Sequence, residues 1–195
     1  MAGRGGAVRE RMVRAGLELF TERGYSSVSL IQVVERAGAP RGSIYYHFPG
    51  GKRELSIEVA ASWQRTLEQV VSRLGAATDD AGSFLRSYID HFRELITSAD
   101  FNVGCPMVTL SADSGAEGCD EIRAAVARTF TALVDRVGVE LSAKGVDRAR
   151  APMIASTVVS ATQGALTVSR VIRSAEPFEQ IQAMIPSLLT ASARP

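Results

Sequence analysis

The chain has 195 residues, of which 46% are hydrophobic and 22% are charged. This length and apolar fraction allow a buried core, either in one large domain or in a small domain joined to a larger one. The net charge of +1 is unevenly spread, since residues 1–53 carry nine cationic and four acidic side chains and the remainder carries 13 and 17. A basic N-terminal part on an acidic body predicts that the N-terminal part meets an anionic polymer or surface.

The cysteines and the apolar stretches exclude several classes of protein. Cys105 and Cys119 are too few for a disulfide framework and have no second Cys or His pair that would complete a zinc site. The N-terminus lacks the unbroken apolar run of a signal peptide. The longest charge-free stretch, Met153 to Ser169, is too polar to span a membrane, which needs about 20 apolar residues. We therefore expect a soluble, cytoplasmic protein with reduced cysteines, no cofactor and no metal site.

The first 40 residues predict two helices separated by a tight turn. Apolar or small residues recur from Val8 to Phe20 at the spacing of one helical face, and Gly24 stands where a left-handed cap would end this helix. Ser29 and Gln32 form the pattern of a capping box for a short second helix. Gly38 is expected to end that second helix.

The stretch "GSIYYHFPGGK" belongs to the next predicted helix, which runs from Pro40 to about His47. Ile44 and Phe48 are four residues apart, so both can point toward a core. Cationic, hydroxyl, aromatic and glycine positions are then left on the outer sides. A short helix of this kind suits insertion into the major groove of DNA.

The rest of the chain reads as further helices. We expect them from Lys52 to about Gly75, around residues 84–95, in a short piece from Pro106, at 122–141, from a cap at Asp147 to about Arg173, and around 178–189 with Pro186 as a kink. No segment alternates with the period of a strand. The predicted fold class is all-α with about nine helices.

The run "LELFTERGYSSVSLIQVVERAGAPRGSIYYHFPGGKREL", residues 17–55, closely resembles the DNA-binding domain of the TetR/AcrR family of transcriptional regulators. "HFPGGK" and "GCPMVTLSAD" are similar to the LmrA/YxaF branch. The resemblance implies a three-helix helix-turn-helix domain at 1–52 and a helical ligand-binding and dimerisation domain at 53–195. It also implies a homodimer that binds a double-stranded operator, most often as a repressor, and that a small hydrophobic or aromatic effector releases.

The resemblance also assigns roles to residues of the DNA-binding domain. Phosphate contacts fall to Ser29 and to Lys52, which stands one residue farther from the histidine than in many members. The remaining positions read bases or contact the DNA backbone and thymine methyl groups. The base-reading positions are Arg41, Gly42 and Ser43, and the others are Tyr45, Tyr46 and His47.

In the body, large side chains from five predicted helices are candidates for the effector site, although simple core packing explains each of them about as well. They are Trp63, Tyr88, Phe92, Met107, Phe130 and Gln163. Gln163 carries the most weight, because a buried amide in a charge-free stretch needs a partner. The small residues between 153 and 169 predict a dimer interface, together with Phe178, Ile181 and Leu188 of the last helix.

Two other functions remain open from the sequence. One is a small helical enzyme with an auxiliary DNA-binding head, which the sequence supports poorly because it contains none of the common catalytic motifs. We therefore predict that the protein is not an enzyme. The other is a DNA-binding regulator that responds to a redox or protein signal. His91 has no metal-spaced partner, and we expect it to be an ordinary core or surface histidine.

Overall fold

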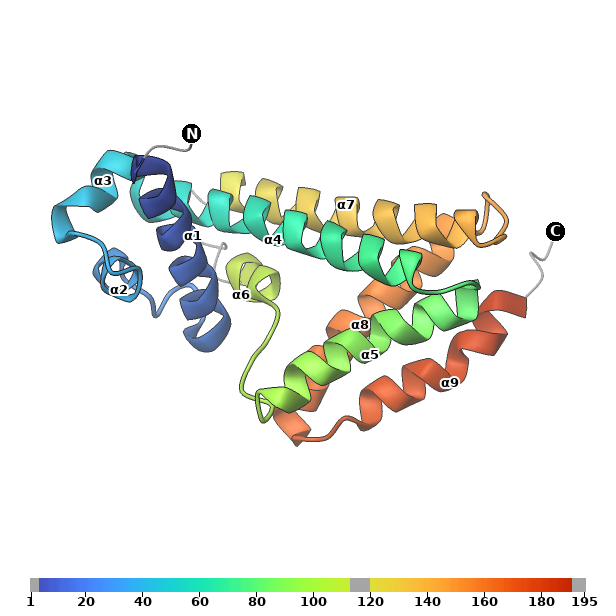
Figure 1. The fold of residues 1–195 in the computed structure, drawn as a ribbon. Helices are drawn as coiled ribbons and strands as arrows, with labels where there is room; N and C mark the ends of the chain where they lie inside the picture. The colour runs from blue at the N-terminus through green and yellow to red at the C-terminus, as the bar shows by residue number, and fades with distance from the viewer. Residues whose placement is uncertain (1–3, 113–119, 191–195) are drawn as a thin grey trace. The chain divides into compact units, whose positions relative to one another are not determined.

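The structure is a computed structural model that describes residues 4–112 and 120–190 (Figure 1). Within these ranges the regular structure is entirely helical, which confirms the predicted all-α class. Cys119 lies outside the described residues. The helices are α1 (Arg4–Arg23), α2 (Leu30–Arg36), the 3-10 turn η1 (Arg41–Ser43), α3 (Ile44–His47), α4 (Gly51–Ala76), α5 (Ala81–Ser98), α6 (Pro106–Ala112), α7 (Asp120–Ala143), α8 (Ala151–Ile172) and α9 (Glu176–Thr190).

The chain forms two compact units, and the long helices α4 and α7 contribute residues to both. The first unit contains Met1–Arg65 and Cys105–Thr129, and the second contains Thr66–Gly104 and Phe130–Pro195. The domain boundary at residue 52 stays a prediction. Within the described ranges, no helix combines the length and the apolarity that a membrane crossing requires.

The first unit is built on α1, which packs against α2. The buried positions of α1 recur every three or four residues, at Met12, Ala15, Leu19 and Phe20. Val33 and Val34 are the buried residues of α2. Burial of each large apolar side chain contributes about 1.5–3 kcal/mol, so this shared face holds the two helices together.

Both ends of α2 follow the sequence signals. The Ser29 hydroxyl accepts from the amide of Gln32 at 3.3 Å, and the Gln32 side chain accepts from the amide of Ser29 at 2.7 Å, which confirms the capping box. Gly24 and Gly38 have φ angles of +80° and +60°, a region that favours glycine. These two glycines let the chain turn sharply before and after α2.

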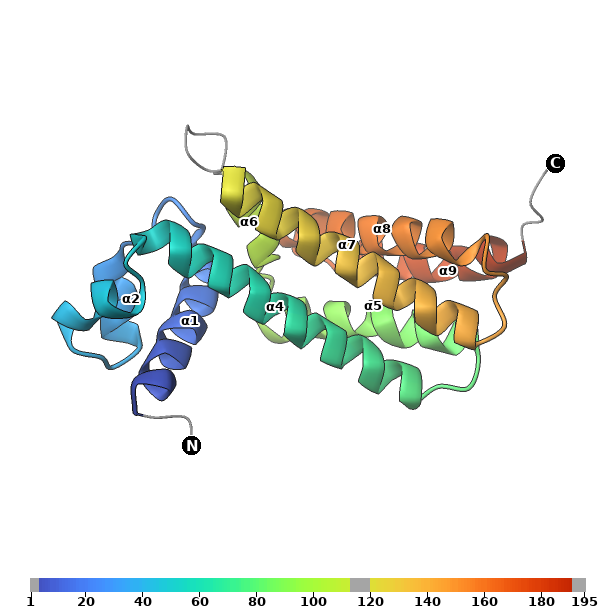
Figure 2. The same ribbon diagram turned by 90° about the horizontal axis from the view of Figure 1, so that it is seen from above.

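The second unit contains α5, α8 and α9, which lie together in Figure 2 and contact one another. Each turn of α5 buries a large residue, at Phe84, Tyr88, Phe92 and Ile96. The helix α8 begins at Ala151, so the predicted cap at Asp147 is wrong. The Asp147 carboxylate instead accepts from the amide of Ala149, in a turn that precedes the helix.

Candidate nucleic-acid interface

The segment after Gly38 is held to the first unit by two side chains. Ile44 is 4% exposed and Phe48 is fully buried, as their spacing predicted. The expected helix from Pro40 is corrected, because Pro40 has extended backbone angles and the segment opens with the 3-10 turn η1 before the single turn of α3. The Ser43 hydroxyl donates to the Pro40 carbonyl at 2.6 Å and so fastens this opening turn.

The outer side of η1 and α3 is exposed and carries aromatic and cationic groups. Tyr45 is 64% exposed and Tyr46 is 82% exposed, while the Arg41 side chain is 79% exposed. His47 is half-buried, with its ring 5.0 Å from that of Tyr46. Tyrosine combines a large apolar ring with a hydroxyl, so two such side chains in solvent form a surface that is suited to a partner.

Neither crowding nor backbone conformation within this chain requires a glycine at position 42. A Cβ atom added to Gly42 meets nothing within 4 Å, and its φ angle lies outside the region that favours glycine. The missing side chain therefore leaves the backbone of η1 open to close approach from outside the molecule.

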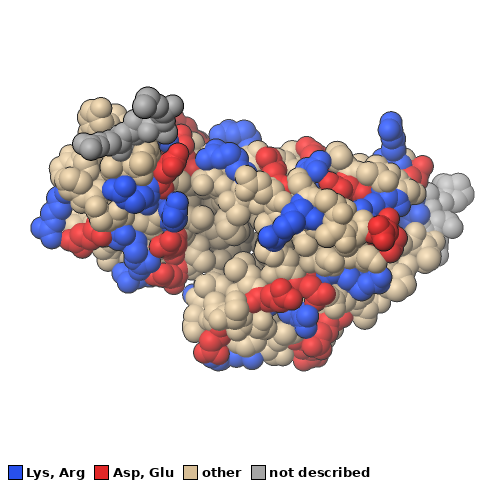
Figure 3. Space-filling view, viewed as in Figure 1, with Lys and Arg blue, Asp and Glu red and all other residues tan. Residues whose placement is uncertain are grey.

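Acidic residues pair with the arginines around this segment. Arg36 donates to Glu22 through both terminal nitrogens, at 3.0 and 3.1 Å, and lies 3.4 Å from Glu18. This hydrogen bonding lowers the pKa of Glu22 and raises the pKa of Arg36. Arg41 donates to Glu35 at 2.7 Å. Figure 3 shows the resulting mixture of cationic and acidic side chains over the part of the molecule that contains α1 to α3.

The Lys52 ammonium makes a specific contact within the first unit. Its Nζ donates to the Tyr25 carbonyl at 2.6 Å and lies 4.1 Å from the centre of the Tyr25 ring. Lys52 thus ties the start of α4 to the turn before α2. An ammonium has three donor hydrogens, and the bond to Tyr25 uses one of them.

Sequence reasoning missed two features of this unit. The first is the contact between Glu35 and Arg41, because residues six apart meet only through a turn whose geometry the sequence does not give. The second is a hollow of about 160 Å³ where arginines of α1 and α2 come together. It is lined by Arg11, Arg14, Ala15, Glu18, Arg36 and Ala37. The cationic residues of α1 were the sequence signal that could have indicated this hollow.

The six effector-site candidates are divided between the units. Trp63 and Met107 belong to the first unit, and the other four belong to the second. Tyr88 and Phe92 are buried neighbours on α5, with ring centres 5.1 Å apart. Phe130 is half-buried at the point where α7 enters the second unit.

Helix α8 carries buried polar atoms that the described residues leave without a hydrogen bond. They are the Gln163 amide oxygen, as its sequence context suggested, and the hydroxyl oxygens of Thr162 and Ser169. An unsatisfied buried oxygen costs about 1–3 kcal/mol.

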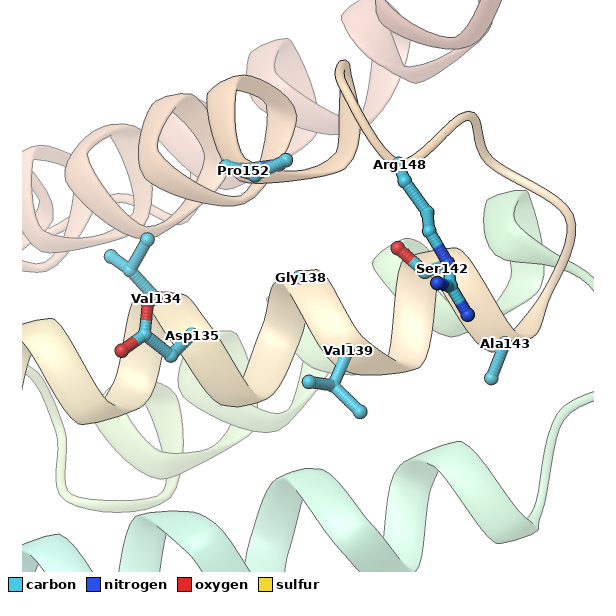
Figure 4. A pocket seen from close by; sticks show the side chains of 8 residues that line it. All are labelled: Val134, Asp135, Gly138, Val139, Ser142, Ala143, Arg148 and Pro152. Atoms are coloured by element: carbon cyan, nitrogen blue, oxygen red, sulfur yellow. The ribbon is translucent and has the colours of Figure 1, made fainter.

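An open groove of about 630 Å³ lies along α7 and the start of α8 (Figure 4). It contains none of the six effector-site candidates. Its lining is largely apolar, with Arg148 and Asp135 as the charged members. The lining residues are Val134, Asp135, Gly138, Val139, Ser142, Ala143, Arg148 and Pro152.

Burial affects two further titratable groups, Cys105 and His91. Burial raises the pKa of the Cys105 thiol, which disfavours the reactive thiolate. His91 is half-buried, and burial followed by the charge of Arg73 lowers its pKa. No group of three His, Cys, Asp or Glu side chains that could hold a metal occurs among the described residues.

A capped helix, a tight glycine turn and a short helix with an exposed polar and aromatic side define a helix-turn-helix regulator of transcription. The sequence model described as bacterial regulatory proteins of the tetR family matches residues 13–59. A second model, described as the C-terminal domain of LmrA/YxaF-like transcriptional regulators, matches residues 81–184. The chain therefore belongs to the TetR family of DNA-binding transcriptional regulators, in its LmrA/YxaF-like branch.

Individual relatives cover nearly the whole chain. An uncharacterised HTH-type transcriptional regulator of Mycobacterium tuberculosis is 32% identical over 187 residues, which are 94% of each chain. The transcriptional regulator LmrA of Bacillus subtilis is 29% identical over 94% of this chain and 97% of its own. The crystal structure of a TetR transcriptional regulator from Legionella pneumophila shares the fold, with a TM-score of 0.80 at 20% identity, over 93% of this chain and 96% of its own.

Proposed function

We propose that the protein is a dimeric repressor in the cytoplasm that binds an inverted-repeat operator and releases it when a small hydrophobic or aromatic effector binds. The exposed side of η1 and α3 carries this proposal. Ile44 and Phe48 are buried on its inner side, while Tyr45, Tyr46 and Arg41 are largely exposed to solvent on its outer side. The family and the relatives are transcriptional regulators, and we propose no catalytic activity.

In this proposal the residues of the first unit contact different parts of the DNA. Arg41 stands at the start of the recognition segment, residues 41–47, and donates to base edges, with Gly42 and Ser43 close to the floor of the groove. Tyr45, Tyr46 and His47 contact the DNA backbone and thymine methyl groups. Ser29 and Lys52 contact phosphates on either side, which fixes the register of the protein without reading sequence.

The dimer forms through an uncharged face of α8. Exposed residues on this face recur every three or four positions, at Met153, Thr157, Ser160, Gly164, Val168 and Val171. A Cβ atom added to Gly164 meets nothing within 4 Å, so a partner helix has room to approach closely. Surface helices normally carry charge on their outer face, and this face carries none between residues 151 and 169. A second copy of the same helix supplies the missing cover.

Helix α9 packs against α8, but its contribution differs from the sequence prediction. Phe178 is fully buried inside the second unit and so is not available to a partner. Ile181 and Leu188 are half-buried, and Met184 is 56% exposed. We propose that Met184, rather than Phe178, extends the contact surface of α8.

We propose that the effector binds in the interior of the second unit. The unsatisfied oxygens of Thr162, Gln163 and Ser169 are acceptors, and the rings of Tyr88 and Phe92 offer apolar surface. This combination suits a small, largely apolar molecule with a few donor groups.

Selection of binding sites from random DNA with the full chain tests the proposal. We expect enrichment of an inverted repeat whose half-site centres lie about one helical turn apart, or a multiple of that distance. A screen of small aromatic compounds for release of the selected site then tests effector control. Enrichment of no sequence would contradict the regulatory function, and enrichment of a single half-site would contradict the dimer.

A further inference from the structure

We propose that Glu35 is a specificity-determining residue that acts by orienting Arg41 toward a base and away from the DNA backbone. The proposal rests on the proposed function, since it assumes that Arg41 reads DNA. It assigns a role in DNA reading to an acidic residue on the helix that precedes the recognition segment.

The geometry of the turn brings the two residues together. Glu35 lies in the last turn of α2, and Arg41 is the first residue of η1. Gly38, with its positive φ angle, reverses the chain between them. The Glu35 Oε1 atom then accepts a hydrogen bond from Arg41 Nη2 at 2.7 Å. The side chains are 50% and 79% exposed, so this contact is made on the outer surface of the unit.

The neighbouring ion pairs leave Glu35 to Arg41. Arg36, the next residue on α2, donates to Glu22 with both terminal nitrogens and also to Glu18. The acidic residues of α1 therefore neutralise the last cation of α2. Arg36 therefore pairs with Glu18 and Glu22 of α1, whereas Arg41 pairs with Glu35 of α2.

An exposed pair of this kind contributes little to folding stability, and its effect must be sought in binding. A free arginine side chain samples many rotamers, and ordering a long side chain on binding weakens affinity by about 2- to 12-fold. A carboxylate that already holds Arg41 Nη2 removes much of this loss. The guanidinium has five donor hydrogens, so it can keep this bond and still donate to both O6 and N7 of guanine.

The charge of Glu35 adds selectivity to this positioning. A carboxylate next to the guanidinium repels phosphate groups, so it disfavours the arrangement in which Arg41 moves to the DNA backbone. Contacts to the backbone occur on any sequence, whereas contacts to base edges occur only on the correct one. Glu35 thus lowers binding to unrelated DNA and favours the base-reading position of Arg41.

Three substitutions of Glu35 separate orientation from charge. Glu35→Ala removes both, Glu35→Asp keeps the charge on a shorter side chain, and Glu35→Gln keeps an acceptor of the same length without the charge. The full-length variants are compared with wild type in site selection and in affinity for unrelated DNA at fixed salt. Glu10→Gln, an equal charge change at an exposed position of α1, is the matched control.

We expect Glu35→Ala and Glu35→Asp to reduce the preference at one base pair of each half-site by about 2- to 12-fold, with a smaller loss for Glu35→Gln. Glu35→Ala and Glu35→Gln should also bind unrelated DNA more tightly than wild type and than Glu35→Asp. Glu10→Gln should leave the base preference unchanged. In an Arg41→Ala background, Glu35→Ala should have no further effect at that base pair. Circular dichroism during heating checks that each variant is folded.

Unchanged base preference in both Glu35→Ala and Glu35→Asp would overturn the proposal. A change that persists in the Arg41→Ala background would overturn it as well, because Glu35 would then contact a base directly. Failure of the regulatory function itself is recognised separately, since wild type would then select no sequence at all.

Discussion

The recognition segment and helix α8 both present surfaces that the single chain leaves exposed, and the surfaces are of opposite kinds. Residues 41–47 expose an arginine on the 3-10 turn η1 and two tyrosines on the single turn of α3, and the buried Ile44 and Phe48 hold this segment in place. Helix α8 has 22 residues and exposes only uncharged, mostly small side chains along one face. Aromatic and cationic groups suit a polyanion with grooves, whereas a flat uncharged strip suits another helix of the same kind. The nature of an exposed surface therefore indicates the partner.

The largest expected effect breaks the α8 surface. Gly164→Arg places a charged side chain on the uncharged face and should yield monomers. Because a monomer binds one half-site instead of two, operator affinity should fall by about 10²- to 10⁴-fold. Sedimentation and gel-shift titration measure the two effects. Thr131→Arg, at an exposed position of α7, is the control and should remain dimeric. A dimeric Gly164→Arg protein would place the interface elsewhere.

The next effect concerns the anchors of the recognition segment. Phe48→Ala removes a fully buried ring, and such changes lower the free energy of unfolding by about 3–5 kcal/mol. DNA binding should be lost while the dimer persists. Tyr46→Ala removes an exposed ring two residues earlier, on α3, so it should weaken DNA binding with a change in stability within about 0.5 kcal/mol. Urea denaturation compares the two, and equal destabilisation would contradict the assignment of inner and outer sides.

A smaller loss is expected from the base-reading residue. Arg41→Ala should reduce the free energy of operator binding by about 1–3 kcal/mol and relax selection at one base pair per half-site. Binding to unrelated DNA should change much less. Arg41→Lys keeps the charge without the planar fork and should relax the same base pair. If both variants weaken all sequences equally, Arg41 is a backbone contact.

The cap of α2 offers a test with two separable parts. Ser29→Ala should lower stability by about 0.5–2 kcal/mol, because it leaves the amide of Gln32 without its partner. Gln32→Ala removes the other half of the capping box and leaves the Ser29 hydroxyl in place. If Ser29 also contacts a phosphate, operator affinity should fall more in Ser29→Ala than in Gln32→Ala. Equal affinities would limit Ser29 to a structural role.

The smallest effect is a change of slope. Lys52→Met removes the ammonium and keeps most of the stem. The plot of log affinity against log salt concentration should become shallower by about one unit, as expected for one lost phosphate contact. A slope that stays the same, together with lower stability in urea, would mean that the ammonium serves only the contact with Tyr25.

Local signals in the sequence predicted much of the first unit. The capping box at Ser29, the glycine turns and the anchors Ile44 and Phe48 depend on residues within four positions of one another, and the structure confirms them. The 3-10 opening of the recognition segment was not predicted, since proline is equally compatible with the first turn of an α-helix. Whether the assigned residues contact DNA stays a prediction.

The second unit was predicted less completely because its packing joins distant segments. The charge-free stretch of α8 was visible in the sequence. The apolar pattern of α9 did not show that Phe178 is buried inside the unit. The contact between Glu35 and Arg41 was missed for a related reason, since it depends on the exact path of a turn. Side-chain pairing across turns and between helices depends on the three-dimensional path of the chain, which local sequence patterns do not give.

The carboxylates paired with arginines in the first unit act as built-in counterions. When a phosphate displaces such a carboxylate, one anion exchanges for another on the protein, and fewer ions are released to solution than the number of arginines suggests. Operator binding should therefore respond to salt less steeply than the number of cationic residues implies. The pairs to which this applies are Arg9 with Glu58, Arg36 with Glu18 and Glu22, and Arg53 with Glu121.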